Sequence, residues 1–226
     1  LDTGKILPIG FTGDDGEGYD LRKGLEALGC DCSGLFVCSE RYTPTYLKPQ
    51  NIRVIGLAGE AERYDTKNRE ILPESIEDTI INHLEKIIND IDAVIIMDQA
   101  DEVNCGVITD TVREHLIKLG DKRPELIFWT DSRHRAGLFT NVVLKCNAKE
   151  TLVSLSWPVD DQSPEKLTQA GYALSAKTGR PLFLTRGEDG IIVFDKDTSE
   201  PVKGISISGP VDPTGAGDSV TASAVL

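Results

Sequence analysis

Apolar strand-like runs alternate with amphipathic helical segments along most of this chain. Residues 92–97 are almost entirely apolar and rich in Ile and Val, which is typical of a strand buried on both faces. In residues 76–87, shortly before this run, Ile or Leu recurs at the spacing of a helix face. Parallel strands need a crossover connection, which a helix usually supplies. The alternation therefore predicts an α/β fold with a mainly parallel sheet.

One part of the chain breaks this alternation. Three short strand candidates, at residues 34–39, 43–49 and 52–57, follow one another without a helix between them. Consecutive short strands predict a small antiparallel flap attached to the main sheet. We therefore expect one domain over residues 1–226, with lid strands at roughly residues 33–58. The polar segment that follows, residues 59–73, is predicted to be a loop.

Charge and cysteine usage limit the classes of partner. The chain has 24 Lys and Arg against 37 Asp and Glu, a net charge of −13. Nucleic acid and anionic membrane surfaces both require a basic footprint, so we expect neither as a partner. The five cysteines contain no Cys-x-x-Cys pair, and the three histidines show no ligand spacing with them. This usage indicates free thiols in a reducing compartment, and hence a cytoplasmic protein.

The sharpest local pattern is Gly-Pro-Val-Asp-Pro-Thr-Gly-Ala-Gly-Asp-Ser at residues 209–219. Gly215 and Gly217 allow backbone N–H groups to approach a ligand closely. The helix predicted to begin at Ser219 adds unsatisfied N–H donors and a positive dipole end, which together suit a phosphate. Asp218 would disfavour an anion there, but it could accept a proton from an attacking hydroxyl. From spacing alone, a turn with Asp218 as helix N-cap is an equally good explanation.

The eight residues Asp-Pro-Thr-Gly-Ala-Gly-Asp-Ser resemble the C-terminal signature of the ribokinase/PfkB-like carbohydrate kinases. Three earlier pieces occur in that family's order: Gly-Asp-Asp at residues 13–15, Asn-x-x-Glu at residues 147–150 and Thr-Arg-Gly-x-x-Gly at residues 185–190. Each alone has a structural explanation, as N-cap acids, a capping pair or a β-turn. Their joint occurrence favours the family, which implies a ribokinase-like, three-layer, doubly wound sheet with a small β lid.

The resemblance implies phosphoryl transfer from ATP to a hydroxyl of a sugar or sugar phosphate. It implies a general base and an anion hole of backbone N–H groups, formed by Asp218 and by Gly215, Ala216 and Gly217. It also implies cofactor-binding residues: Asn147, and three that face the nucleotide phosphates, namely Thr185, Arg186 and Gly187. The implied metal-binding residues offer oxygen ligands: Glu150, together with Asn147, for Mg²⁺ through water, and Asp212 and Thr214 for a monovalent cation such as K⁺.

Some features resemble one branch of the family more closely. The Gly-Asp-Asp region, the start of the lid at residues 41–45 (Arg-Tyr-Thr-Pro-Thr) and Asp131-x-Arg133 are similar to the heptose-phosphate kinases. We therefore assign contacts with a sugar or sugar phosphate to Asp15, Lys48 and Arg133. Lys48 and Arg133 have solvated surface charge as an alternative explanation. The lid is also where we expect a homodimer contact.

Two parts that the family usually has are expected to be missing. One is a sugar-binding segment before the first strand and the other an adenine-binding segment after the signature helix, so we expect a chain truncated at both ends. Two other functions stay open: a nucleoside kinase of the same fold, and a non-catalytic kinase-like binding or assembly module. The sequence contains neither a Walker A motif nor the protein-kinase motif set.

Overall fold

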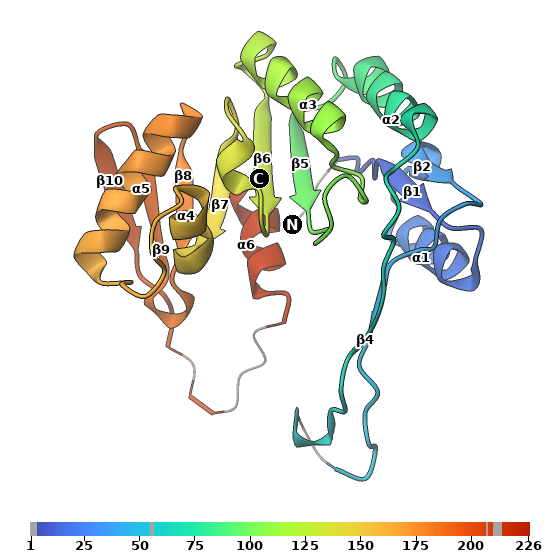
Figure 1. The fold of residues 1–226 in the computed structure, drawn as a ribbon, viewed down its shortest axis with the longest axis horizontal. Helices are drawn as coiled ribbons and strands as arrows, with labels where there is room; N and C mark the ends of the chain where they lie inside the picture. The colour runs from blue at the N-terminus through green and yellow to red at the C-terminus, as the bar shows by residue number, and fades with distance from the viewer. Residues whose placement is uncertain (1–3, 55–56, 207, 210–213) are drawn as a thin grey trace. The chain divides into compact units, whose positions relative to one another are not determined.

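The structure, a computed structural model, describes residues 4–54, 57–206, 208–209 and 214–226 of the chain. The chain divides into two compact units (Figure 1). The first comprises Leu1–Asn89 and Asn104–Val107, and the second comprises Asp90–Val103 and Ile108–Leu226. Each unit is described by itself below. The assignment of a single domain to residues 1–226 stays a prediction.

Six strands form the sheet of the second unit, in the order β10-β9-β8-β7-β6-β5. The parallel strands are β5 (Ala93–Asp98), β6 (Ile127–Ser132), β7 (Val143–Asn147) and β8 (Leu182–Thr185). At the far side, β9 (Ile191–Asp195) runs antiparallel to β8, and β10 (Thr198–Val202) runs antiparallel to β9. Leu144 and Cys146 of β7 and Leu182 and Leu184 of β8 are fully buried. The mainly parallel sheet confirms the prediction from the sequence. The expectation that β5 is buried on both faces is wrong, because Ile95 and Met97 are exposed.

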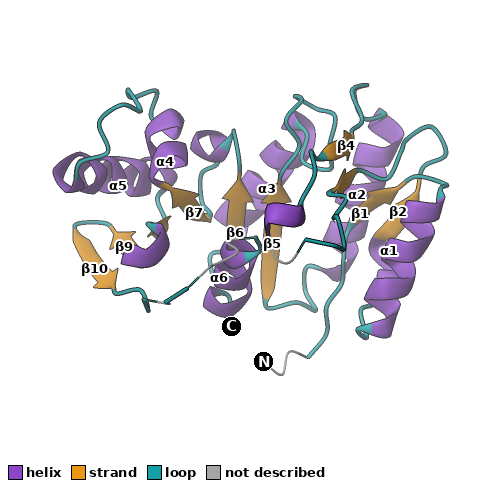
Figure 2. Cartoon of the chain, turned by 90° about the horizontal axis from the view of Figure 1, so that it is seen from below, coloured by secondary structure: helices purple, strands orange, loops and turns teal. Residues whose placement is uncertain are grey.

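Helices cover both faces of this sheet (Figure 2). One face carries α3 (Asp110–Lys122), α4 (Ala148–Ser154) and α5 (Pro164–Thr178), and the other carries α6 (Ala216–Ala224). The indole N–H of Trp129, on β6, donates to the hydroxyl of Thr221 on α6 at 3.2 Å. The second unit therefore has the three layers of a doubly wound fold. None of the described helices is both long enough and apolar enough to span a bilayer.

Local backbone features set the start of two helices. Helix α3 begins at Asp110, because the hydroxyl of Thr109 accepts the N–H of Val112 at 3.2 Å and caps it there. The helix expected from Ser219 begins at Ala216. Gly215 adopts a left-handed φ of 79° immediately before it, which favours glycine.

The first unit contains two separate two-stranded sheets. Strands β1 (Gly10–Thr12) and β2 (Leu35–Val37) pair in parallel, and β3 (Thr45–Leu47) pairs antiparallel with β4 (Tyr64–Thr66). Its helices are α1 (Gly16–Ala27) and α2 (Glu74–Ile87). Shorter 3₁₀ turns occur in both units, at Cys32–Gly34, Leu57–Gly59, Ala136–Leu138 and Gly187–Asp189.

The sequence placed two strands of the first unit wrongly. Strand β2, expected in the antiparallel flap, pairs in parallel with β1. Residues 52–54 form a turn instead of the third expected strand, and β4 lies in the segment predicted to be a loop. The side chains of Tyr64 and Thr66 are exposed, so backbone pairing with β3 defines β4 more than burial does. An apolar pattern cannot mark such a strand. Leu21 of α1 and Leu28 just after it recur at helical spacing but are exposed, so this repeat does not mark a buried face.

The Gly-Asp-Asp motif forms a hydrogen-bonded cap at the start of α1. Oδ1 of Asp15 accepts the N–H of Gly18 at 2.8 Å and the hydroxyl of Thr43 at 2.6 Å. Its Oδ2 accepts the backbone N–H of Thr43 at 2.8 Å, while Oγ1 of Thr43 accepts the N–H of Gly13 at 2.9 Å. The bond from the Thr43 hydroxyl is the largest cause of a lowered pKa of Asp15. The structural explanation of this motif, an N-cap acid, is thus confirmed.

The substitution Thr43→Val tests this cap. It removes the hydroxyl and leaves the buried N–H of Gly13 without its partner, so we expect the free energy of unfolding to fall by about 1–3 kcal/mol at neutral pH. Urea unfolding measures the change. Thr66→Val, at an exposed position of β4, is the control, with an expected change within about 0.5 kcal/mol.

The pH dependence gives a second reading of the same variant. Because the pKa of Asp15 is lowered in the folded state, the cap stabilises the protein above the ordinary aspartate pKa and loses this effect as the pH falls through the lower, folded-state pKa. The difference between Thr43→Val and the wild type should therefore shrink in acid. An equal difference in unfolding free energy at neutral and at acidic pH would contradict the role assigned to Asp15.

Candidate active site

Two of the expected site residues of the second unit lie at the ends of neighbouring strands. Asn147 ends β7, Thr185 ends β8, and the two residues are partners in the parallel pairing. The hydroxyl of Thr185 donates to the carbonyl of Cys146 at 3.4 Å. Open α/β sheets bind ligands at the carboxyl ends of their strands. The structure therefore brings together two residues that belong to separate sequence motifs.

A pocket of about 500 Å³ opens at this edge of the sheet. All four expected cofactor-binding residues line it: Asn147, Thr185, Arg186 and Gly187. Pro164 and Leu167 of α5 contribute an apolar wall. The guanidinium of Arg186 forms an ion pair with Asp189 at 3.0 Å, so an anionic ligand would compete with this carboxylate. The volume and the mixed lining suit a small organic ligand.

Asn147 and Glu150 form a complete capping box at the start of α4. Oδ1 of Asn147 accepts the N–H of Glu150 at 2.9 Å, and Oε2 of Glu150 accepts the N–H of Asn147 at 2.8 Å. The capping explanation of Asn-x-x-Glu is therefore confirmed. Burial raises the pKa of Glu150 above its ordinary value, against the lowering effect of the Asn147 N–H.

The same carboxylate fits a water-mediated magnesium site. Within the described part of the chain, the cap occupies Oε2 of Glu150, and no partner is recorded for Oε1. Mg²⁺ commonly binds one or two carboxylates while keeping several waters and contacting substrate phosphates. No group of three or more His, Cys, Asp or Glu side chains among the described residues could hold a metal by itself. The residues present therefore suit a shared site, not a closed protein cage.

The first turn of α6 presents backbone donors. The first hydrogen bond inside the helix joins the N–H of Ser219 to the carbonyl of Gly215 at 2.9 Å, which leaves the N–H groups before it without a partner in the helix. Gly215, and not Asp218, is the N-cap, so the N-cap explanation of Asp218 is wrong. Asp218 lies inside the first turn and is exposed. Thr214, the residue before the N-cap Gly215, is exposed. Asp212 lies outside the described residues.

Sequence reasoning missed Lys145. Its ammonium lies 2.7 Å from Oδ2 of Asp131, and both side chains are buried. The two residues are partners in the pairing of β6 with β7. The amide of Gln99 lies 3.4 Å from the other oxygen of Asp131. The available signal was a lysine inside an otherwise apolar strand, because a buried lysine needs an acidic partner.

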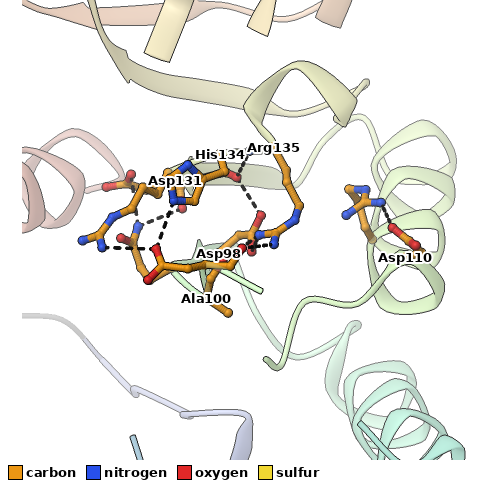
Figure 3. A network of polar contacts seen from close by, with 11 residues as sticks. Asp98, Ala100, Asp110, Asp131, His134 and Arg135 are labelled. Atoms are coloured by element: carbon orange, nitrogen blue, oxygen red, sulfur yellow. Dashed lines mark hydrogen bonds and ion pairs between the residues drawn. The ribbon is translucent and has the colours of Figure 1, made fainter. Parts of the chain in front are cut away.

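A second buried ion pair fixes the loops at this edge. Figure 3 shows Arg135 reaching toward Asp98, the last residue of β5, at 3.2 Å. The guanidinium also donates to the carbonyls of Ala100 and Asp101, at 2.8 and 2.9 Å. Ser132 donates its hydroxyl to Asp98 at 2.6 Å. These bonds hold the loop after β5 against the turn after β6, and removing either charge would leave the other buried and unpaired.

The three residues assigned to the acceptor lie in different units. Asp15 and Lys48 belong to the first unit, where Asp15 is the N-cap described above and Lys48 forms an exposed ion pair with Glu60 at 3.0 Å. Arg133 belongs to the second unit and is part-exposed, 3.8 Å from Asp101. These contacts leave the acceptor roles of the three residues as predictions.

Comparison with known sequences identifies the family. The sequence profile of the pfkB family of carbohydrate kinases matches residues 4–226. The chain belongs to this family. Bifunctional protein HldE from Helicobacter hepaticus is 28% identical over 222 residues, which cover 96% of this chain and 43% of that protein. The chain therefore spans less than half the length of this curated pfkB relative.

Solved structures share the fold. Ribokinase from Arabidopsis thaliana, complexed with ribose and ATP, has a TM-score of 0.67 at 16% identity, over 96% of this chain and 67% of that one. Phosphofructokinase-2 from Escherichia coli, in complex with fructose-6-phosphate, has a TM-score of 0.64 at 15% identity, over 96% and 68%. The ribokinase-like α/β fold expected from the sequence is thus confirmed.

The variant Glu150→Gln separates capping from metal binding. Glutamine keeps the capping box but removes the charge, so the fold should be retained. We expect the Mg²⁺ concentration for half-maximal turnover to rise about tenfold or more, as it does when ligand-supporting groups are lost. Glu165→Gln, at an exposed position in the first turn of α5, is the control and should leave this requirement unchanged.

Because the pKa of Glu150 is raised, the Mg²⁺ requirement should also depend on pH. Protonation removes the negative charge, so the Mg²⁺ requirement of the wild type should grow as the pH falls toward the raised pKa. Glu150→Gln should show no such growth from this group. A variant with wild-type magnesium and pH profiles would restrict Glu150 to its capping role.

Proposed function

We propose that this protein transfers the terminal phosphoryl group of ATP, with Mg²⁺, to a hydroxyl of a sugar or a sugar phosphate. The observation that most supports the proposal is the first turn of α6, where N–H groups without a partner inside the helix and the exposed carboxylate of Asp218 occur together. A helix N-terminus favours a phosphate. A carboxylate beside that phosphate is useful as a proton acceptor for the attacking hydroxyl.

In the proposed mechanism, the N–H groups of Gly215, Ala216 and Gly217 bind the oxygens of the transferring phosphoryl group. Charge spreads over these oxygens during transfer, so positioning and charge stabilisation supply most of the catalysis. The acceptor oxygen forms a bond to phosphorus as the bond to the ADP oxygen breaks. Asp218 takes the proton of the acceptor hydroxyl. Mg²⁺, when bound, would neutralise phosphate charge near Glu150.

The pocket at the ends of β7 and β8 is the proposed nucleotide site. Asn147, Thr185, Arg186 and Gly187 line it together, although they come from two sequence motifs. Arg186 is the cation of this set and would exchange its bond with Asp189 for a phosphate. Binding of a monovalent cation by Asp212 and Thr214 stays a proposal without structural support.

We propose only the chemical class of the acceptor, a sugar or a sugar phosphate. The two solved relatives were crystallised with ribose and with fructose-6-phosphate, so the fold accommodates plain and phosphorylated sugars. The resemblance of Asp131-x-Arg133 to the heptose-phosphate kinases favours a phosphorylated sugar as the acceptor. The cytoplasmic location, the absence of nucleic-acid and membrane partners and a homodimer through the lid remain predictions.

The variant Asp218→Asn tests the general base. It removes the proton acceptor at nearly constant volume, so we expect turnover to fall on the order of 10²-fold or more. ADP release over a panel of sugars, sugar phosphates and nucleosides measures this and names the acceptor. Asp197→Asn, in the exposed turn between β9 and β10, is the matched control. Calorimetry with Mg-ATP should show that Asp218→Asn still binds nucleotide.

Each outcome favours one function. Turnover on a sugar or sugar phosphate that is lost in Asp218→Asn supports the proposal, and turnover on a nucleoside alone would favour a nucleoside kinase. Equal rates for Asp218→Asn and the wild type would remove Asp218 from the mechanism. A wild-type protein that binds Mg-ATP but turns over no acceptor would favour a binding or assembly module.

A further inference from the structure

Lys145 is a buried cation that lies against the start of α6. The residue is 6% exposed in the middle of β7. A Cβ atom built on Gly217, in the first turn of α6, would lie only 3.2 Å from its Nζ atom. Neither the capping box nor the nucleotide pocket includes Lys145. Its place in the fold therefore needs a separate explanation.

Helix stability does not explain this placement. The N-terminus of a helix carries roughly half a positive charge, so cations stabilise a helix at its opposite end. A lysine ammonium beside Gly217 adds positive charge where the N–H groups of α6 already point. Burial strengthens the repulsion, because little water screens it. The combined positive charge favours an anion at this point.

Asp131 compensates only part of the positive charge that Lys145 and the N-terminus of α6 bring together. Its Oδ2 lies 2.7 Å from the ammonium and is the one partner recorded for Lys145 among the described residues. An ammonium carries three N–H donors, so two remain for another acceptor. One carboxylate balances the lysine alone, and the carboxylate of Asp218, in the first turn of α6, is exposed, so water screens its effect on the helix N-terminus. A ligand with several anionic oxygens would satisfy both.

We propose that the ammonium of Lys145 binds the terminal phosphoryl group during transfer and that Asp131 is the residue that positions it. This inference rests on the proposed function and adds a catalytic residue to it. Lys145 keeps its protons throughout and donates N–H bonds to the phosphoryl oxygens. The acceptor proton still goes to Asp218, and the bond that breaks is still the one to the ADP oxygen. Donors fixed in a dry site stabilise developing charge without reorganisation.

The position of Lys145 along β7 agrees with this role. Asn147, which lines the nucleotide pocket, follows two residues later, or about 7 Å along a strand. The side chain of Lys145 reaches Gly217, on the helix that carries Asp218. Strand β7 thus connects the proposed nucleotide site with the proposed anion hole. A terminal phosphoryl group must lie between these two places.

A purely structural ion pair makes a different prediction. Replacing both members of a buried pair with neutral side chains of similar size is often harmless, whereas removing one leaves a buried charge unpaired. Lys145→Met alone is therefore ambiguous, since it can fail by unfolding. The double variant Asp131→Asn with Lys145→Met removes both charges and isolates the function of the ammonium. Asp131→Asn alone keeps the ammonium, and Lys118→Met, at an exposed position of α3, is the control.

The experiment compares stability, turnover and nucleotide preference of these variants. We expect the double variant to melt near the wild-type temperature but to lose on the order of 10²–10³-fold in kcat, as when a transition-state donor is removed. The KM of the acceptor should change little. Calorimetry should show that the double variant loses the preference for a non-hydrolysable ATP analogue over ADP. Asp131→Asn should lose less kcat than the double variant, and Lys118→Met should match the wild type.

Two results would overturn the inference: wild-type kcat in the double variant, or an unchanged analogue preference in it. The proposed function fails in a distinguishable way. If the wild type binds nucleotide but turns over no acceptor, the proposed function is contradicted, while the analogue preference still decides the role of Lys145. If the wild type binds no nucleotide, both proposals are wrong.

Discussion

The parallel pairing of β5 to β8 is the constraint on which the site of the second unit depends. Strands that run in one direction end at one edge. There this chain places Asn147 and Thr185, with Asp131 and Lys145 one and two residues before the ends of β6 and β7. Their motifs are far apart in sequence, and the shared strand direction alone brings them together. Helix α6, attached to the sheet by the bond from Trp129 to Thr221, brings the glycine-rich turn to the same sheet.

Several side chains have a structural role at positions that also suit a function. Glu150 closes the capping box of α4 with one oxygen and retains the other, and its raised pKa indicates a carboxylate with too little compensation. Asp15 is instead satisfied by Thr43 and Gly18, and its lowered pKa reflects those bonds. Each of these two acids lies at the start of a helix, Asp15 at α1 and Glu150 at α4. The difference in their environments makes Glu150 the better candidate for binding a cation.

The family and most of the fold could be predicted from the sequence, but the lid region could not be predicted as reliably. Apolar strands and helix caps leave local signals, as the apolar residues of β5 and the Asn-x-x-Glu at the start of α4 did. Strand β4 leaves none, because its side chains are largely exposed and its partner, β3, decides where it lies. The start of α6 was also missed, since a left-handed Gly215 begins the helix earlier than the apolar pattern suggests.

The sequence by itself determined the alternation of strands and helices, the capping box of Asn147 and Glu150 and the family, because each depends on neighbouring residues or on an ordered set of motifs. Only the tertiary structure decided which distant side chains meet. Pairing of β6 with β7 places Asp131 beside Lys145, and packing of α6 on the sheet places Lys145 beside Gly217. No local pattern encodes these contacts, since they follow from strand register and from the approach of a helix across the sheet.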